Sequence, residues 1–386
     1  MVNGSKSASA RQRVELAEGA AGCVASILDD LAAESVLLVA DEQALRHSGA
    51  EAALASALAP RRVDRFTQFE LNPKIADVER GVALFRRALA DVVLAVGGGS
   101  AIDIAKVIGA CGVHEGKPCD YVLGRRQLER AGPPLVAMPT TAGTGSEATH
   151  FAVVYVDRQK YSLAHEVLLP THAIIDPLLT HSLPPRITAA SGLDALCQAI
   201  ESMWAVGATD ESLDYATCAL RLAIDHLEAA VRNPTPPARR AMAEAAHLAG
   251  KAINISKTTA PHAFSYALTT QCNVPHGMAV ALTIGPLFVY NSRVEESDCL
   301  DPRGAAHVRA RIAQAVELLG AASPVDAHHR LESLLRAVGC PTRLQAHGIA
   351  REDYGPLIEQ VNVERLANNP RALDGAALAK LLLTIE

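Results

Sequence analysis

One stretch decides the fold class of this chain, DVVLAVGGGSAIDIAK at residues 91–106. Residues 91–96 have the apolar character of a buried strand, and residues 101–109 have the character of a helix. The glycines between them allow close approach of a pyrophosphate to the helix N-terminus, where amide donors and the helix dipole favour an anion. A glycine-rich turn alone also fits a purely structural role.

Other parts of the first half repeat this strand pattern, with short apolar runs at residues 35–40, 134–138 and 173–175. Continuous apolar strands that alternate with helices predict a parallel sheet covered on both faces. After residue 183 the pattern is Ala- and Leu-rich with helical periodicity, as at residues 193–203, 212–231, 237–252 and 305–319. We therefore expect a Rossmann-like α/β dinucleotide-binding domain over residues 1–183 and an all-helical domain over residues 184–386.

Further residues of the first half suit a dinucleotide at the carboxyl ends of the strands. Asp103 and Lys106 stand one turn apart on the helix after the glycines, and a second loop, PTTAGTGS at residues 139–146, offers hydroxyls. Asp41 follows the first strand, where a carboxylate accepts from a ribose and repels a 2′-phosphate, so NAD(H) is predicted over NADP(H). Alternatively, Asp41 caps the next helix.

The second half carries a candidate metal site. Asp194 and Gln198 are four residues apart and share one face of a predicted helix. His262 and His276 add two imidazoles, and this donor set suits a divalent ion with open positions. Taken singly, each histidine also fits a core position, and the Asp/Gln pair fits a helix surface.

Composition excludes several classes of protein. The chain has 386 residues, 49% of them hydrophobic, and a net charge of −6 without a basic block, so we expect no nucleic-acid partner. No apolar run reaches the roughly 18 residues of a membrane span. Eight cysteines without a CxxC motif predict free thiols in a reducing cytoplasm.

Five motifs together resemble one known family. They are GGGSAIDIAK (97–106), PTTAGTGSE (139–147), DPLLTHSLP (176–184), GLDAL (192–196) and PHGMAVAL (275–282). This combination is similar to the iron-dependent, or group III, alcohol dehydrogenases. The resemblance implies a dehydroquinate synthase-like architecture with the active site in the cleft between two domains, and commonly a homodimer.

The same resemblance implies roles for individual residues. Asp41 would contact the adenosine ribose, and Lys160 matches a cofactor-contacting lysine. The pyrophosphate would lie on Gly97, Gly98, Gly99 and Ser100, and the nicotinamide side on Thr140, Thr141 and Thr144. A divalent ion, Fe²⁺ or Zn²⁺, would be held by Asp194, Gln198, His262 and His276.

Two departures from the family pattern are informative. The family has histidine at the positions of Gln198 and Tyr266, so we expect weaker metal binding and a proton relay through a phenol. The runs GLDALCQAIES (192–202) and GKAINISKTTAPHAFSY (250–266) resemble the branch of phosphonoacetaldehyde reductases, which make 2-hydroxyethylphosphonate. The predicted phosphonate contacts are Ser256, Lys257, Thr258 and Thr259, with Lys257 also placing the carbonyl for reaction. Alternatively, Lys257 is a surface lysine and the hydroxyls cap a helix.

The expected function is therefore NADH-dependent reduction of phosphonoacetaldehyde in phosphonate biosynthesis, with the metal polarising the carbonyl. Three alternatives stay open. They are a reductase of another small aldehyde, a metal-free oxo-acid reductase similar to the maleylacetate reductases, and a nucleotide-binding protein without catalysis.

Overall fold

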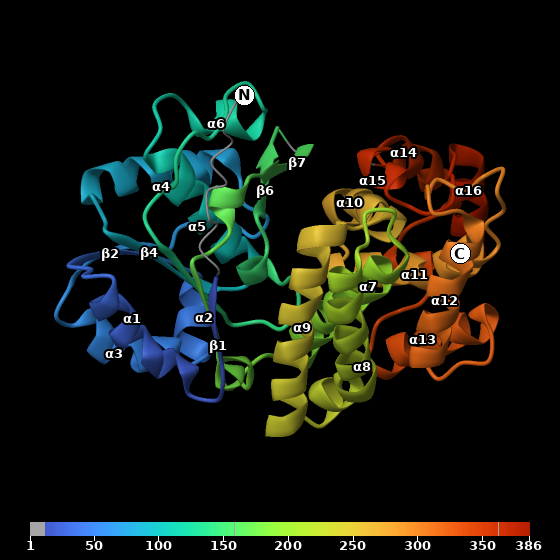
Figure 1. Cartoon of the computed structure of the whole chain (residues 1–386), viewed down its shortest axis with the longest axis horizontal. Coiled ribbons are helices and arrows are strands. Elements are labelled where there is room, and N and C mark those ends of the chain that lie inside the picture. The colour runs from blue at the N-terminus through green and yellow to red at the C-terminus, as the bar shows by residue number, and fades with distance from the viewer. Residues whose placement is uncertain (1–11, 158, 362) are drawn as a thin grey trace, which may run out of the picture. The chain divides into compact units, whose positions relative to one another are not determined.

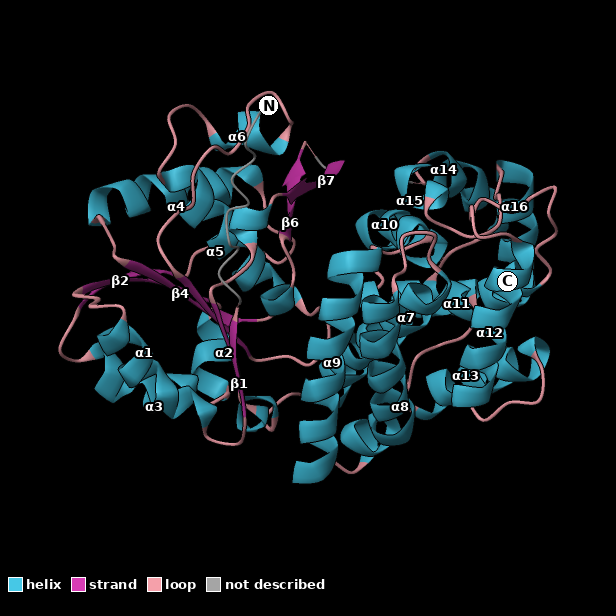
Figure 2. Cartoon of the chain, in the orientation of Figure 1, coloured by secondary structure: helices cyan, strands magenta, loops and turns pink. Residues whose placement is uncertain are grey.

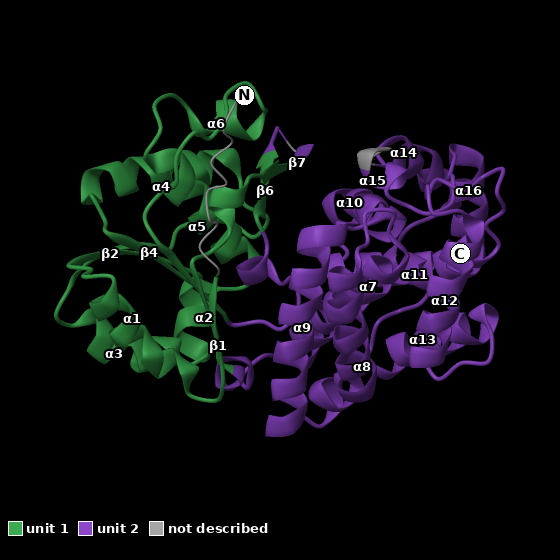
Figure 3. Ribbon diagram, in the orientation of Figure 1, with its two compact units in different colours: residues 1–139, 150–155, 161–176 green, residues 140–149, 156–160, 177–386 purple. Residues whose placement is uncertain are grey.

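A computed structural model of the chain describes residues 12–157, 159–361 and 363–386, without the side chains of residues 363 and 364. The described residues form two compact units (Figure 3). Unit 1 comprises the described residues within 1–139, 150–155 and 161–176, and unit 2 comprises those within 140–149, 156–160 and 177–386. The boundary expected from the sequence lies after residue 183, whereas compactness assigns residues 140–149, 156–160 and 177–183 to the helical unit.

The described residues of unit 1 contain a six-stranded sheet in the order β1-β8-β5-β4-β2-β3, and all five neighbouring pairs run parallel. This confirms the predicted parallel sheet. Its strands are β1 (Arg13–Leu16), β2 (Ser35–Ala40), β3 (Arg62–Phe66), β4 (Val92–Gly97), β5 (Leu135–Pro139) and β8 (His172–Ile175). Every residue of β2, β4, β5 and β8 is buried, which explains their continuous apolar sequences.

Helices cover both faces of this sheet (Figures 1 and 2). They are α1 (Val24–Asp30), α2 (Glu42–His47), α3 (Ala50–Leu58), α4 (Ile75–Ala88), α5 (Gly99–Gly112) and α6 (Pro118–Val122). A separate two-stranded sheet pairs β6 (Phe151–Val156) with β7 (Gln159–Ala164). Strands β1, β3, β6 and β7 are not among those predicted from the sequence. Polar, partly exposed residues interrupt β1, β3 and β7, whereas β6 has the apolar sequence FAVVYV.

Unit 2 is helical around a buried central helix, α7 (Pro185–Trp204), which packs against α8, α9, α11 and α12. The other helices are α8 (Asp210–Arg232), α9 (Pro236–Ser256), α10 (Ala260–Cys272), α11 (His276–Ser292), α12 (Ala305–Leu318), α13 (Pro324–Ala337), α14 (Tyr354–Glu359), α15 (Val363–Ala367) and α16 (Gly375–Thr384). The fold class predicted from the sequence, an α/β part followed by a helical part, is confirmed.

In the described residues, no helix combines the length and the hydrophobicity that a membrane crossing requires. The eight cysteines all lie in the described part of the chain, and each is free.

Candidate functional site

The helix α7 presents three polar side chains on one face. Asp194, Gln198 and Glu201 follow each other at helical spacing, and their exposed fractions are 3%, 3% and 0%. Burying three polar side chains lowers the stability of the fold unless each one has a hydrogen-bond or ligand partner. The groups around them therefore indicate what they bind.

Two further helices bring histidines to this face. His262 lies in the first turn of α10, and His276 is the first residue of α11. One ligand atom each from Asp194, His262 and His276 lies within 4.8 Å of the others. The His262 Nε2 atom is 3.2 Å from Asp194 Oδ1, and the His276 Nε2 atom is 4.0 Å from it. The structure thus gathers three of the four residues predicted as metal ligands into a cluster of the right size for an ion.

A glycine makes this convergence possible. A side chain on Gly277 would place its Cβ 1.9 Å from the Ala190 carbonyl oxygen and 2.8 Å from the Asp194 amide nitrogen. Helix α11 therefore begins against α7 only because residue 277 has no side chain, and this contact sets His276 beside Asp194.

Gln198, the fourth predicted ligand, supplies a test of whether these residues fit a metal. Its Nε2 atom donates to the Thr144 carbonyl oxygen at 3.3 Å, whereas its Oε1 atom is buried with no hydrogen-bond partner among the described residues. A buried acceptor in this state is costly. An amide oxygen beside two imidazoles and a carboxylate fits a divalent cation, and the cation would satisfy it.

The hydroxyl loop predicted to serve the nicotinamide belongs to unit 2 and lies next to this cluster through the Thr144–Gln198 bond. Close glycine contacts hold the loop: a Cβ on Gly145, which has a φ of 61°, would meet the Gly250 Cα atom of α9 at 2.4 Å. The Thr140 Oγ1 atom is buried without a partner among the described residues, so it is available to a ligand. Thr141 is half-buried.

The glycine turn of unit 1 has the predicted form. Strand β4 ends at Gly97, whose φ of 148° excludes most side chains, and α5 begins at Gly99 with Gly98 as its cap residue. A Cβ on Gly97 would lie 2.7 Å from the Ala101 Cβ atom. The turn therefore keeps an open backbone at a helix N-terminus, as phosphate binding requires.

The polar neighbours of this turn have protein partners. Asp41 caps α2, because its Oδ1 atom accepts from the Ala44 amide at 2.8 Å. The Asp103 carboxylate accepts from the Val153 amide at 2.9 Å, and Lys106 donates to the Phe151 carbonyl at 2.8 Å. Asp103 and Lys106 thus hold β6, and Ser100 accepts from the Asn72 amide at 3.2 Å. Their predicted cofactor contacts stay predictions.

Comparison with known proteins agrees with this arrangement. Residues 12–177 match the model of the iron-containing alcohol dehydrogenases, and residues 188–385 match that of the C-terminal part of the Fe-containing alcohol dehydrogenase family. The chain belongs to the iron-containing alcohol dehydrogenase family. It is therefore an oxidoreductase of the alcohol dehydrogenase class.

Three relatives illustrate the range of the family. The chain is 38% identical over 325 residues to the phosphonoacetaldehyde reductase of Streptomyces viridochromogenes, covering 81% of this chain and 80% of that protein. It is 33% identical to the 1,3-propanediol dehydrogenase of Klebsiella pneumoniae, covering 85% of this chain and 81% of that one. A solved structure, the sulfoacetaldehyde reductase of Bifidobacterium kashiwanohense in complex with NAD⁺, has a TM-score of 0.86 at 28% identity and covers 97% of this chain and 96% of its own.

In this family member, the two histidines of the cluster differ in charge. Burial lowers the pKa of His262, but the carboxylates of Glu201 and Asp194 outweigh burial and raise it to about 10. Burial and the charge of Lys160 lower the pKa of His276 to about 3, although Asp194 opposes them. His276 is therefore neutral at physiological pH and offers a lone pair to a metal.

Tyr266 lies one turn after His262 on α10 and is flanked by cations. The Lys160 Nζ atom is 3.6 Å from the centre of its ring, and the Arg365 guanidinium hydrogen-bonds its hydroxyl. Burial raises the pKa of Tyr266, but the charges of Lys160 and Arg365 outweigh burial and lower it below its ordinary value. Arg365 is not recognisable from the sequence, because only the fold brings α15 to α10.

Lys257 ends α9 with an unusual backbone. Its φ of 61° and ψ of 176° fall in a region that essentially only glycine adopts. Asn368 fixes this conformation, because its side chain donates to the carbonyls of Ser256 and Thr258 on either side. Burial and the charge of Arg365 lower the pKa of Lys257 to about 8. A strained lysine kept where glycine would cost less points to a role for its side chain.

Two of the three hydroxyls next to Lys257 have protein partners. The Ser256 hydroxyl donates to the Ser202 hydroxyl at 2.9 Å, and the Thr259 hydroxyl donates to Glu201 at 2.9 Å. Thr258 is buried. The Lys257 Nζ atom also donates to the Asn254 carbonyl, at 3.3 Å. The substrate contacts predicted for all four residues stay predictions, and Lys257 is the one that enters the proposal below.

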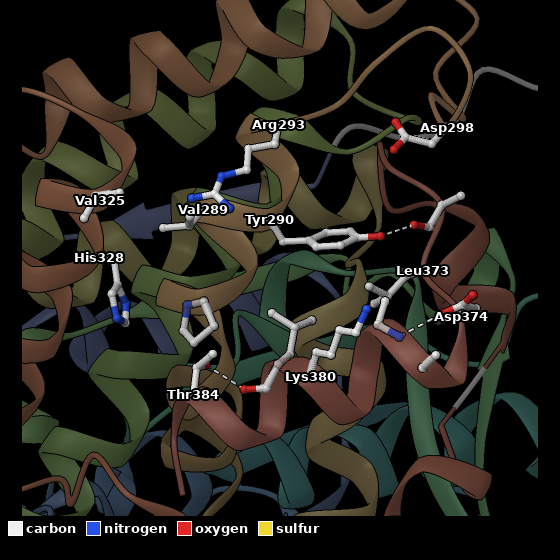
Figure 4. Close-up of a pocket in the computed structure, with 15 residues that line it drawn as sticks. Val289, Tyr290, Arg293, Asp298, Val325, His328, Leu373, Asp374, Lys380 and Thr384 are labelled. Carbon is white, nitrogen blue, oxygen red and sulfur yellow. Dashed lines mark hydrogen bonds between the residues drawn. The ribbon is translucent and has the colours of Figure 1, made fainter.

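A separate cavity of about 810 Å³ lies in unit 2 among α11, α13 and α16 (Figure 4). Its lining includes Tyr290, Val325 and Lys380, and among the described residues it includes none that the sequence analysis selects for the site. This cavity is therefore not the candidate site.

Proposed function

We propose that this protein reduces phosphonoacetaldehyde to 2-hydroxyethylphosphonate with NADH, as a step of phosphonate biosynthesis. The observation that carries this substrate is the cation group Lys160, Lys257 and Arg365. Arg365 interacts with both Tyr266 and Lys257, and Lys160 interacts with Tyr266 and His276. A phosphonate one methylene away from an aldehyde carbon needs cations within a few ångströms of the group that binds the carbonyl. The contacts of Lys160 and Arg365 with Tyr266, one turn after His262, support such a placement of the cations.

The comparisons support an anionic aldehyde. One relative is a phosphonoacetaldehyde reductase and one similar structure is a sulfoacetaldehyde reductase, and both names describe two-carbon aldehydes with an anionic group. The 1,3-propanediol dehydrogenase at 33% identity acts on an uncharged substrate by its name, so identity alone does not choose between the two kinds.

The reacting groups are assigned as follows. Asp194, Gln198, His262 and His276 would hold Fe²⁺ or Zn²⁺, which when bound supplies a Lewis acid for the aldehyde oxygen. Lys257 and Arg365 hold the phosphonate by charge-assisted hydrogen bonds and so fix the position of the carbonyl. Tyr266 delivers the proton that the product oxygen takes up, and its lowered pKa makes it a stronger acid than an ordinary phenol.

We assign cofactor contacts in each of the two units separately. Gly97, Gly98, Gly99 and Ser100 would receive the pyrophosphate, and Thr140, Thr141 and Thr144 the nicotinamide side, with Lys160 nearby. Asp41 keeps one carboxylate oxygen for the cap of α2, and we assign the other to the adenosine ribose, so NAD(H) is preferred over NADP(H). We further propose a cytoplasmic homodimer.

A substrate panel tests this function. The purified protein, loaded with Fe²⁺ or Zn²⁺ or stripped with a chelator, is assayed for NADH oxidation with phosphonoacetaldehyde, sulfoacetaldehyde, acetaldehyde and propanal. The expected result is a kcat/KM for phosphonoacetaldehyde at least tenfold above that for the uncharged aldehydes, and only in the loaded protein. Equal or better rates with propanal would overturn the phosphonate assignment, and full activity after stripping would overturn the metal assignment. A preference for sulfoacetaldehyde would keep the cation group and change the substrate.

A further inference from the structure

Glu201 is a buried carboxylate that the assignments above do not use. It lies on α7, three residues after Gln198 on the same face, and it is fully buried. A carboxylate without solvent needs several donors, and Glu201 has four of them. The Thr259 amide donates at 2.8 Å, the Thr259 hydroxyl at 2.9 Å and the His262 amide at 3.3 Å, all to Oε1, while His262 Nδ1 contacts Oε2.

This arrangement fixes the carboxylate rather than leaving it to rotate. Three donors share one oxygen, and the second oxygen is left for the imidazole. The Trp204 indole N–H donates to the Thr259 hydroxyl at 3.0 Å, so that hydroxyl directs its own hydrogen to Glu201. Trp204 and Thr259 are themselves fully buried. The direction of the Oε2 atom is thereby determined by groups that cannot move independently.

A carboxylate that only accepts hydrogen bonds requires a hydrogen on His262 Nδ1. A metal ion would displace the hydrogen of the other ring nitrogen, Nε2, and take its lone pair; Nε2 is the atom 3.2 Å from Asp194 Oδ1 and the one that faces the cluster. We propose that Glu201 is a positioning residue that selects the Nδ1–H tautomer of His262 and so presents Nε2 as a metal ligand. This inference rests on the metal assignment of the proposed function and adds a residue to it.

The chain contains a second buried pair of the same chemistry. Glu147 Oε1 lies 3.1 Å from His247 Nδ1, and both side chains are buried in unit 2. His247 is not a member of the metal-ligand cluster. The Glu147–His247 pair therefore provides a matched control, because the same substitution there removes a buried carboxylate without touching a ligand.

The decisive variant is Glu201→Gln, which preserves size and replaces Oε2 by an amide. Its carbonyl oxygen still accepts from Thr259 and His262, but its NH₂ group donates to Nδ1 and forces the hydrogen onto Nε2, where the lone pair is needed. Affinity for Zn²⁺ and Co²⁺ is measured by competition with a chromophoric chelator, together with the absorption spectrum of the Co²⁺ protein. We expect Glu201→Gln to weaken metal binding 10- to 100-fold, the range for such supporting groups, while Glu147→Gln retains the wild-type affinity.

A wild-type metal affinity in Glu201→Gln would overturn the positioning role and leave the proposed function intact, whereas a wild-type protein that binds no ion would overturn both. Should Glu201→Gln fail to fold, ¹⁵N spectra of histidine side chains in the Zn²⁺-loaded wild-type protein decide the question. A hydrogen on Nδ1 of His262 is expected there, and a hydrogen on Nε2 would contradict the inference.

Discussion

At the scale of single residues, Lys257 combines a strained backbone with the charge that we assign to substrate selection. A φ of 61° with a ψ of 176° costs a lysine about 1–3 kcal/mol, and glycine would avoid this cost. The charge of Lys257 and the strain at Lys257 are separable, since different substitutions remove one or both.

Lys257→Gly removes both the charge and the strain, and Lys257→Ala removes the charge alone. We expect Lys257→Gly to have a free energy of unfolding about 1 kcal/mol above that of Lys257→Ala, after subtracting the greater chain entropy of glycine. Both variants should raise the KM for phosphonoacetaldehyde about tenfold or more, because a hydrogen bond to a charged group contributes about 1.5–3 kcal/mol. Urea unfolding and steady-state kinetics measure the two effects. A glycine variant less stable than the alanine variant would show that the backbone is not strained.

The pKa of Lys257 predicts how activity depends on pH. Because burial and Arg365 lower it to about 8, the ammonium is present below pH 8 and is lost as the pH rises above it. The kcat/KM for phosphonoacetaldehyde, which reports ionisations of the free enzyme, should fall as the pH rises through about 8. The kcat/KM for propanal should not show this fall. A fall of the same size in Lys257→Ala would assign the ionisation to another group.

Gln198 yields a prediction about the metal. Gln198→Leu removes the buried Oε1 atom that has no partner in the described residues, as well as the bond from Nε2 to Thr144. In the metal-free protein, removing the unpartnered acceptor stabilises the fold and losing the bond to Thr144 destabilises it. The free energy of unfolding should therefore change by less than about 2 kcal/mol. The dissociation constant for Zn²⁺ should rise at least about tenfold, because the substitution removes a ligand. Even residues that only support a ligand change metal affinity 10- to 100-fold when they are replaced. Unchanged Zn²⁺ affinity, measured by chelator competition, would exclude Gln198 from the ligand set.

At the scale of elements, the contact between the hydroxyl loop and α9 depends on two glycines. In Gly250→Ala the new Cβ would lie 2.6 Å from the Gly145 carbonyl oxygen, so the loop must move. We expect a loss of about 1–3 kcal/mol in unfolding free energy and a higher KM for NADH.

Gly355→Ala is the control for this substitution, because a Cβ on Gly355 meets no atom of the described residues within 4 Å. It lies in α14 and should leave stability unchanged or raise it by up to about 1 kcal/mol. Wild-type stability and NADH affinity in Gly250→Ala would contradict the close packing of the loop.

The elements also show how far the sequence leads. Residues 35–40 and 91–96 are recognisable as strands because both faces of these strands are buried, so no polar residue interrupts them. Strand β3, with the sequence RVDRF, lies at the sheet edge and has partly exposed charges, so it lacks the apolar pattern that identifies a strand. The helical spacing of Asp194 and Gln198 predicts a shared face, whereas the approach of α10 and α11 depends on packing at Gly277.

The same limit applies to the site. Lys257 is recognisable because it is near His262 in the sequence, but Lys160 and Arg365 come from distant segments and join Tyr266 only in the folded unit. Glu201 shares the helical spacing of the ligands, and its role depends on the direction of His262 Nδ1, which sequence does not specify. Asp103 and Lys106 have the predicted spacing, yet their bonds lead to β6.

At the scale of the whole molecule, the proposed function assigns different parts of one reaction to the two units. Unit 1 has the glycine turn suited to a dinucleotide, and unit 2 has the metal-ligand cluster, the hydroxyl loop and the cation group. The chain as a whole has a net charge of −6, so the cation group is a local feature and not a consequence of overall charge. In the proposed function, this local cation group is what would distinguish the reduction of an anionic aldehyde from general aldehyde reduction.

The most direct test of this central claim follows the substrate itself by ³¹P NMR. Phosphonoacetaldehyde is incubated with NADH and the Fe²⁺- or Zn²⁺-loaded protein, and the Lys257→Ala variant is run in parallel. The account predicts conversion to 2-hydroxyethylphosphonate with one NADH oxidised per product, and at subsaturating substrate a rate at least about tenfold lower in Lys257→Ala. Reduction of propanal by the same loaded protein without any conversion of phosphonoacetaldehyde would contradict it.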